Sequence, residues 1–298
     1  MNYKKYIKSQ RLRFIILRLL SWVPDSIMIR VQYRIKTGRW LNLKHPQRFT
    51  EKLQVYKLKY RNPLIQQCVD KYEVRHFIES KGLGYILNDL YGIYDKSTDI
   101  DFDCLPEQFV IKTTSGSGGL NVLIVTNKTN AIIRDIEQKV TQWRKNNSGQ
   151  VNAGREWAYQ GIKPRIIIEK YLEDEKGLID YKFFCFNGDP KYLYVVTDRI
   201  MGESVALGVF DINFNQLPVY RSDERELTKK VEKPQNFEKM VEVVKVLSSD
   251  FPHVRADLYN INGRIIFGEL TFYDGSGYFM YEPDDFDITA GEFFTEYN

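Results

Sequence analysis

Two Asn-Gly pairs constrain the fold of the second half of this chain. Asn187-Gly188 closes the strand-like run DYKFFCFNG and precedes PKYLYVVTDR, while Asn262-Gly263 separates HVRADLYNING from RIIFGELTF. An Asn-Gly pair between two apolar, strand-like runs is typical of a tight turn that joins antiparallel strands. Further strand-like runs lie at 165–172 and 205–213, and a helical run lies at 236–251. This order predicts the α+β class, an antiparallel sheet with helices on one face.

The first half has a different pattern. Apolar spacing predicts helices over 50–60 and 68–82, with Gly82 as the C-cap of the second. Strand-like runs at 109–112 and 121–126 flank a Gly-rich turn, and an amphipathic helix is expected over 130–145. We therefore expect four parts. They are a basic helical segment (1–48), a helical α/β part (49–108), a small lobe with a Gly-rich lid (109–170) and a larger antiparallel α+β lobe (171–298).

Cysteine, histidine and charge narrow the possibilities. Three widely spaced cysteines and three scattered histidines argue against a disulfide scaffold and a zinc site, and they suit a reducing cytosol. The net charge is +4, but residues 1–48 hold twelve Lys or Arg and a single acid, Asp25. That segment therefore carries +11, and the other residues together carry −7.

The segment MNYKKYIKSQRLRFIILRLLSWVP is not predicted to be a signal peptide or a membrane span. Its apolar run from Phe14 to Val23 is ten residues long, contains Arg18 and has no small-residue cleavage site after it. Two readings stay open. It is either a basic amphipathic helix on an anionic membrane surface, or a helix that packs on the domain with a solvated basic face. No nucleic-acid motif accompanies the charge, so no nucleic-acid partner is expected.

The loop in FVIKTTSGSGGL is a candidate phosphate site. Residues 113–119 carry few bulky side chains and many backbone N–H donors, and Lys112 supplies a positive charge at the mouth of the loop. No Gly-Lys-Ser/Thr closes the loop, so it is not a Walker A motif. Taken alone, it is better explained as a solvated hairpin turn.

A second candidate site lies on the predicted hairpin at 253–272. Period-two alternation puts Arg255 and Asp257 on one face, and the turn brings Asp257 opposite Glu269 or one register away. Facing carboxylates repel unless a cation lies between them, and Mg²⁺ is one such cation. The alternative is that both acids are ordinary solvated residues. The solvated alternative suits Glu269 less well, because Phe267, Leu270 and Phe272 flank this residue in the sequence.

A third feature is RIIIEKYLEDE. A strand that leaves the sheet there would expose backbone N–H and C=O groups to an adenine edge, with Asp174 or Glu175 near ribose hydroxyls. By itself it is also consistent with a strand that ends in a charged turn.

Together these features resemble the ATP-grasp superfamily, and more narrowly its TupA-like branch. That branch is named after a teichuronopeptide-biosynthesis protein and occurs among genes for capsule, O-antigen and cell-wall polysaccharides. The resemblance covers about residues 41–291. It is carried by LNLKHPQRFTEKLQVYKLKYRNPL, DKYEVRHFI, FVIKTTSGSGG, PRIIIEKYL, DYKFFCFNG and VRADLYNINGRIIFGELTFYDGSG.

The resemblance implies roles for individual residues. Lys71 and Lys112 would contact ATP phosphates beneath a lid formed by Ser115, Gly116, Ser117, Gly118 and Gly119. The adenine hinge would be Glu169, Lys170, Tyr171 and Leu172, with Glu175 near the ribose. Asp180 and Lys182 match a motif that the family usually writes with Asp and Arg, and Lys182 would face phosphate or substrate. Arg199 and Arg255 would stabilise the transferring phosphoryl group, while Asp257 and Glu269 would bind Mg²⁺.

Thr271 departs from the family, which usually has Asn there, so a modified metal site is expected. The segment YDGSG (273–277) would be the loop on the substrate side.

The resulting expectation is an ATP- and Mg²⁺-dependent carboxylate–amine ligase that works through an acyl phosphate. It would join an amino acid or other amine to a uronic-acid carboxylate of a surface polysaccharide, at the inner face of the cytoplasmic membrane. One alternative is a glycosyltransferase, since Asp101-Phe102-Asp103 resembles the Asp-x-Asp that holds a nucleotide-sugar metal. That tripeptide is also typical of a solvated loop. A second alternative is a non-catalytic scaffold on the membrane.

Overall fold

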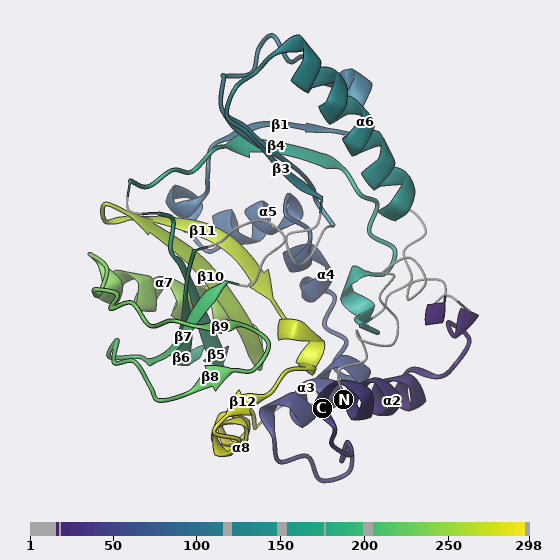
Figure 1. Cartoon of the computed structure of the whole chain (residues 1–298), viewed down its shortest axis with the longest axis vertical. Coiled ribbons are helices and arrows are strands. Elements are labelled where there is room, and N and C mark those ends of the chain that lie inside the picture. The colour runs from purple at the N-terminus through teal and green to yellow at the C-terminus, as the bar shows by residue number, and fades with distance from the viewer. Residues whose placement is uncertain are drawn as a thin grey trace.

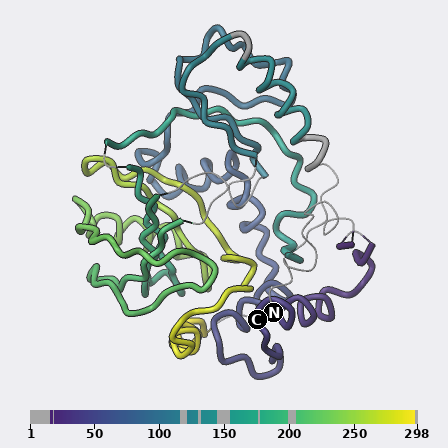
Figure 2. The backbone as a smooth tube through the Cα atoms, in the orientation of Figure 1, coloured from purple at the N-terminus to yellow at the C-terminus, as the bar shows by residue number. Residues whose placement is uncertain are grey.

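Two sheets, one small and one large, form the framework of the protein (Figure 1). The computed structural model describes residues 16–17, 19–115, 121–147, 154–175, 177–198 and 205–295. Figure 2 shows that the described N-terminal residues (purple) and the described C-terminal residues (yellow) both lie at the lower end of the molecule, away from the small sheet. No helix among the described residues has both the length and the apolar character needed to cross a bilayer.

The small sheet has the strand order β1-β4-β2-β3. Helix α6 packs on it, beside the buried residues Phe109 and Ile111 of β2 (Figure 1). β1 precedes residue 109 and pairs with β4, so this sheet includes residues from the part expected to be mainly helical. Its elements are β1 (Leu90–Tyr94), β2 (Phe109–Thr113), β3 (Val122–Val125), α6 (Asn130–Asn147) and β4 (Ile166–Lys170).

The large sheet has the order β11-β10-β5-β6-β7-β9, and every neighbouring pair is antiparallel except β7 and β9. Asn187-Gly188 and Asn262-Gly263 form the two expected turns, and all four residues have a positive φ. Positive φ at both positions is what the favoured two-residue hairpin turn requires. The strands are β5 (Asp180–Phe186), β6 (Asp189–Thr197), β7 (Ala206–Asp211), β9 (Arg225–Glu226), β10 (His253–Ile261) and β11 (Arg264–Thr271).

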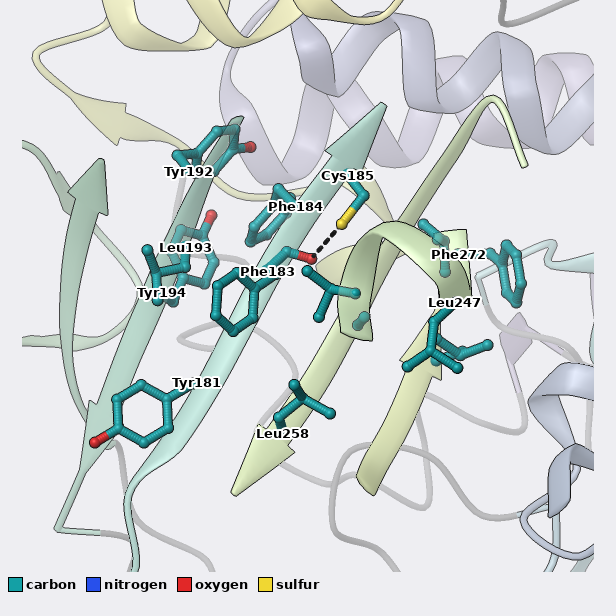
Figure 3. Close-up of a cluster of buried hydrophobic side chains, with 14 of the residues drawn as sticks. Tyr181, Phe183, Phe184, Cys185, Tyr192, Leu193, Tyr194, Leu247, Leu258 and Phe272 are labelled. Carbon is teal, nitrogen blue, oxygen red and sulfur yellow. Dashed lines mark hydrogen bonds between the residues drawn. The ribbon is translucent and has the colours of Figure 1, made fainter. Parts of the chain in front are cut away.

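Helices cover both faces of the large sheet, so the prediction of helices on one face was wrong. The Phe183 ring lies 5.8 Å from Phe237 of α7, whereas the Phe184 ring lies 6.0 Å from Phe49 of α3. Successive residues of a strand point to opposite faces, so α7 and α3 cover opposite sides. The run of buried residues in β5 has the same cause, and Figure 3 shows its aromatic side chains beside those of β6.

The helix expected over 68–82 is broken, which is a second correction. α4 ends at Val69 and α5 begins at Glu73, and the Asp70 carboxylate accepts hydrogen bonds from the backbone N–H groups of Tyr72 and Glu73 at 2.9 and 3.0 Å. This side chain caps the new helix, as Asp commonly does. Lys71 therefore lies between the two helices, and its backbone N–H donates to Thr114 O beside β2.

Among the remaining elements, α7 lies along the side of the large sheet, α4 and α5 lie between the two sheets, and α2, α3 and α8 lie at the lower end of the molecule (Figure 1). The remaining elements are α2 (Asp25–Thr37), α3 (Phe49–Lys59), α4 (Leu64–Val69), α5 (Glu73–Ser80), α7 (Phe237–Ser248), α8 (Asp285–Phe293) and the short pair β8 (Tyr220–Arg221) and β12 (Tyr281–Glu282). Single 3₁₀ turns lie at Gly84–Ile86, Ser97–Asp99, Trp157–Tyr159 and Asp274–Gly277.

Candidate active site

The β10–β11 hairpin brings the expected carboxylates together. Asp257 pairs directly with Glu269, and Arg255 pairs with Thr271, so all four side chains share one face of the sheet. The same face of the neighbouring strand β5 carries Lys182, which is opposite Asp257. The expected approach of Asp257 to Glu269 is confirmed.

Arg255 lies at the centre of this group. Its Nε and Nη2 atoms donate to the two Asp257 oxygens, each at 2.7 Å. Nη2 also donates at 3.0 Å to both Glu269 Oε1 and Thr271 Oγ1. The Lys182 ammonium donates to Asp257 Oδ2 and lies 3.4 Å from Asp180 Oδ2. In this arrangement, the repulsion between the carboxylates is relieved by two cationic side chains.

Sequence reasoning missed the group that holds the other end of Arg255. The buried Asp274 accepts a hydrogen bond from Arg255 Nη1 on one oxygen, and on the other from Arg221 Nη1 at 3.0 Å. Arg221 is also held by Asp223, at 2.9 and 2.7 Å. The only signal for Asp274 was its place in the YDGSG loop. Nothing in the sequence pointed to Arg221.

Burial and neighbouring charges set the pKa values here. Burial alone would raise the pKa of Asp274, but the guanidinium groups of Arg255 and Arg221 lower it below its ordinary value. Burial alone would lower the pKa of Arg255, but Asp257 and Asp274 raise it well above the ordinary arginine value. The site therefore holds a fixed positive charge surrounded by carboxylates.

The small sheet contributes a second group. Lys112 Nζ lies 2.6 Å from Glu169 Oε2, and Arg75 Nη1 of α5 lies 3.3 Å from Glu169 Oε1. Lys112 and Glu169 belong to the adjacent strands β2 and β4 and point to the same face. Glu169 is buried, and it is paired with Lys112, the lysine expected to bind phosphate.

Lys71 joins the two groups. Burial lowers the pKa of Lys71 to about 8, the negative charge of Glu269 opposes that shift, and Lys112 adds to it. Asp70 and Glu169 also act on it with smaller effects. The Lys71 ammonium is therefore within electrostatic reach of both Glu269 on the β10–β11 hairpin and the Lys112–Glu169 pair.

Part of the backbone expected to form the adenine hinge is already hydrogen-bonded within the protein. The backbone of Lys170 is not open, because its N–H donates to Asp89 O at 3.0 Å and its carbonyl accepts from Asn88 Nδ2 at 2.9 Å. Its ammonium lies 3.2 Å from Asp89 Oδ2. Tyr171 and Leu172 follow the end of β4 and are half-buried, and Glu175 is exposed in a turn. Ser115 is half-buried after β2, while Gly116, Ser117, Gly118, Gly119 and Arg199 lie outside the described residues.

Buried polar side chains that the sequence analysis did not predict hold the 273–277 loop in place. Lys57 Nζ of α3 donates to Ser276 O at 2.9 Å and Gly154 O at 3.0 Å, and the Ser276 hydroxyl donates to Glu156. Burial lowers the pKa of Lys57 to about 7, although Glu156 acts to raise it. At Gly277 the φ is 67°, and a Cβ atom would lie 2.4 Å from Gln54 Nε2. The loop is therefore shaped and fixed before any substrate binds.

The expected metal ligands fit magnesium in type, since two carboxylates and a hydroxyl are the oxygen donors that this ion prefers. However, Arg255 Nη2 contacts Asp257, Glu269 and Thr271 together. Among the described residues, no three His, Cys, Asp or Glu side chains form a cluster able to hold a metal ion.

The Asp-x-Asp tripeptide lies apart from this constellation, in a turn before β2. Asp101 and Asp103 are exposed, and Asp101 Oδ1 accepts the backbone N–H of Asp103 at 3.1 Å. Phe102 between them is buried beside Phe109.

A small antiparallel sheet and a large sheet that is antiparallel except for one pair, with helices packed on them, place this protein in the α+β class. Comparison with protein families makes the assignment narrower. The chain belongs to the TupA-like ATP-grasp family, whose model matches residues 51–295. The expected family and fold class are confirmed.

Comparisons with other proteins give fold relatives at low identity. No curated protein matches the sequence significantly. An L-amino acid ligase from Bacillus licheniformis is 15% identical with a TM-score of 0.48, covering 87% of this chain and 57% of that one. The D-alanine–D-alanine ligase from Bacillus anthracis, complexed with ATP, is 15% identical with a TM-score of 0.43 over 69% of this chain and 55% of that one. The chain spans 55–61% of the length of the D-alanine–D-alanine ligases from Bacillus anthracis and Helicobacter pylori that it matches.

Proposed function

We propose that the protein is an ATP-dependent ligase that joins a carboxylate to an amine. The observation that carries this proposal is that the charges of Glu269, on the β10–β11 hairpin, and of Lys112, on the small sheet, both act on the buried Lys71, while Arg255 is hydrogen-bonded to the same Glu269. Phosphoryl transfer needs positioned positive charge more than it needs a nucleophilic side chain. Lys71 and Lys112 would bind the ATP phosphates, and Lys182 and Arg255 would stabilise the group in transfer.

The proposed reaction has two steps. A substrate carboxylate oxygen attacks the γ-phosphorus of ATP, the bond to ADP breaks, and an acyl phosphate forms. The amine then attacks the acyl carbon, inorganic phosphate leaves, and the amine loses a proton as the amide forms. The fixed 273–277 loop would hold the carboxylate beside Arg255, because Asp274 belongs to that loop and holds Arg255.

Magnesium belongs to this proposal as the ion that accompanies the nucleotide. Asp257, Glu269 and Thr271 would hold it, and when bound it would supply positive charge to the phosphate oxygens. Glu269 is more accessible than Asp257, because 43% of its side chain is exposed, compared with 2% for Asp257. In this proposal Asp257 acts mainly to orient Arg255 and Lys182.

The acceptor is proposed to be a uronic-acid carboxylate of a capsular, O-antigen or cell-wall polysaccharide, and the donor an amino acid or another amine. Support comes from the TupA-like family, whose members occur among genes for capsule, O-antigen and cell-wall polysaccharides. A cytoplasmic location follows from the need for ATP. No described feature favours the glycosyltransferase alternative, since the Asp-x-Asp tripeptide lies in an exposed turn outside the converged site.

The test is ATP turnover with a panel of uronic acids and amino acids, in the wild type and in Glu269→Gln and Lys112→Ala. Release of ADP and phosphate only when both substrates are present would support the ligase. Each variant should lose roughly 10²–10³ in rate, as expected for loss of one charge that stabilises the transition state. Lys139→Ala, on the exposed side of α6, is the control and should match the wild type. Binding of a nucleotide sugar without ATP binding would refute the proposal.

A further inference from the structure

Helix α2 carries an apolar stripe on its outer side. Ile27, Val31 and Ile35 are 51%, 46% and 39% exposed, and each is four residues from the next. Residues at this spacing lie above one another on one face of a helix. Exposed large apolar side chains are usually scattered singly over the surface of a soluble protein, whereas a contiguous row of them indicates a binding surface.

The opposite face of α2 is fixed to the protein, so the helix cannot rotate to bury the stripe. Tyr33 is fully buried, and its hydroxyl forms a 3.0 Å hydrogen bond with Thr50 Oγ1 of α3. Gln32 Oε1 accepts from the Tyr278 hydroxyl at 2.7 Å. These contacts therefore hold α2 in the orientation that leaves the stripe exposed.

Two tryptophans flank the stripe. Trp22 precedes α2 and Trp40 follows it, and each is 79% exposed. Tryptophan side chains this accessible are unusual on a protein in water, and the indole ring prefers the boundary between lipid headgroups and acyl chains. Both ends of α2 thus carry the residue type that marks membrane interfaces.

The same face is basic. Arg30 and Arg34 are exposed between the apolar residues, and the Arg34 guanidinium lies 4.8 Å from the centre of the Trp40 ring. The single acid among residues 1–48, Asp25, is paired with Arg155 at 2.8 Å. Among the described residues, neither Arg30 nor Arg34 forms an ion pair with a carboxylate, so this face complements an anionic surface and would repel the same face of a second copy.

We propose that this α2 surface, formed by Trp22, Ile27, Arg30, Val31, Arg34, Ile35 and Trp40, docks the protein onto an anionic lipid bilayer. α2 has 13 residues, too few to cross a hydrocarbon core of about 30 Å, so the helix lies in the plane of the interface. The apolar stripe and the two indole rings enter the boundary region, while the arginines contact lipid phosphates. This inference does not depend on the ligase proposal.

The test is co-sedimentation of the full chain with vesicles of phosphatidylcholine alone and of phosphatidylcholine mixed with phosphatidylglycerol. Binding is expected only to the mixed vesicles, and Val31→Glu should weaken it at least tenfold, because it places a negative charge inside the apolar stripe. Val246→Glu on α7 is the matched control, since Val246 is 39% exposed on a helix outside the surface, and it should bind as the wild type does. Arg30→Gln should weaken binding about fivefold, as expected for one basic residue near an anionic surface.

A second measurement locates the contact. Brominated lipids should quench tryptophan fluorescence, and the Trp22→Phe/Trp40→Phe double variant should lose most of that quenching. Wild-type affinity in Val31→Glu would assign lipid binding to the basic residues before α2 and overturn the proposal. Absence of lipid binding, with a dimer that Val31→Glu dissociates, would show that the surface binds a second copy. ATP turnover without lipid would be unchanged in Val31→Glu, so the two proposals fail separately.

Discussion

Replacing Asp274 by Asn tests whether a buried carboxylate fixes Arg255. Asp274 lies between Arg255 and Arg221, and its side chain is 3% exposed. Removing one partner from a buried ion pair typically costs about 3–5 kcal/mol. Arg255 keeps Asp257 and Glu269, so we expect Asp274→Asn to lose about 3 kcal/mol of unfolding free energy, at the lower end of that range.

The effect on turnover separates positioning from stability. Without Asp274, one side of the Arg255 guanidinium loses its anchor, and a displacement of about 1 Å near the reacting group can cost roughly 10²-fold in rate. We expect kcat to fall by about that factor, while KM for ATP changes little. Urea unfolding and steady-state kinetics measure the two quantities.

Asp223→Asn is the matched control, because it removes another carboxylate from the same Arg221. The Asp223 side chain is 49% exposed, so its loss should cost no more than about 1 kcal/mol and leave kcat unchanged. If Asp274→Asn were as stable and as active as Asp223→Asn, the argument that Asp274 positions Arg255 would be refuted.

Three further predictions concern other parts of the protein. Because burial lowers the pKa of Lys71 to about 8, the kcat/KM for ATP should fall as the pH rises above 8, and Lys71→Met should abolish this dependence. Burial lowers the pKa of His253 from 6.5 to about 3. Between these two pH values the unfolded chain binds one proton more than the folded protein does. The free energy of unfolding should therefore fall by about 1.4 kcal/mol for each pH unit of acidification in that range. His253→Phe should lose that contribution in urea unfolding measured across pH. Gly291→Ala should cost about 3 kcal/mol, since its Cβ would lie 2.0 Å from Gln47 O, whereas Thr289→Ala on the same helix should be nearly neutral.

Sequence patterns predicted the elements that depend on local chemistry. The Asn262-Gly263 turn predicted that Asp257 lies opposite Glu269 or one register away, and a register shift between Asp257 and Leu258 makes the pairing direct. The unbroken apolar run Phe183–Phe186 also contained a signal for a strand buried on both faces, which the one-sided helix prediction overlooked. β1 was missed because its five residues, LYGIY, are few and include a glycine, so they give little periodicity.

The position of Lys71 shows the limit of helical periodicity. The apolar spacing of 68–82 continues through the Asp70–Tyr72 break, so the pattern alone predicts one helix. The Asp70 side chain caps α5 and interrupts it. The interruption, together with the hydrogen bond from Lys71 to Thr114, directs this lysine toward the site.

By itself, the sequence determined the turns, the alternation along each strand and the charged residue types available to a phosphate site. The turns and the alternation depend on residues that are close in the sequence, because local backbone geometry fixes which of their side chains share a face. Only the tertiary structure decided that Arg255 would bridge Asp257 and Glu269, that Asp274 would join Arg255 to Arg221, and that the outer face of α2 would stay exposed. Contacts between distant segments depend on how whole sheets and helices pack, and no local pattern encodes that packing.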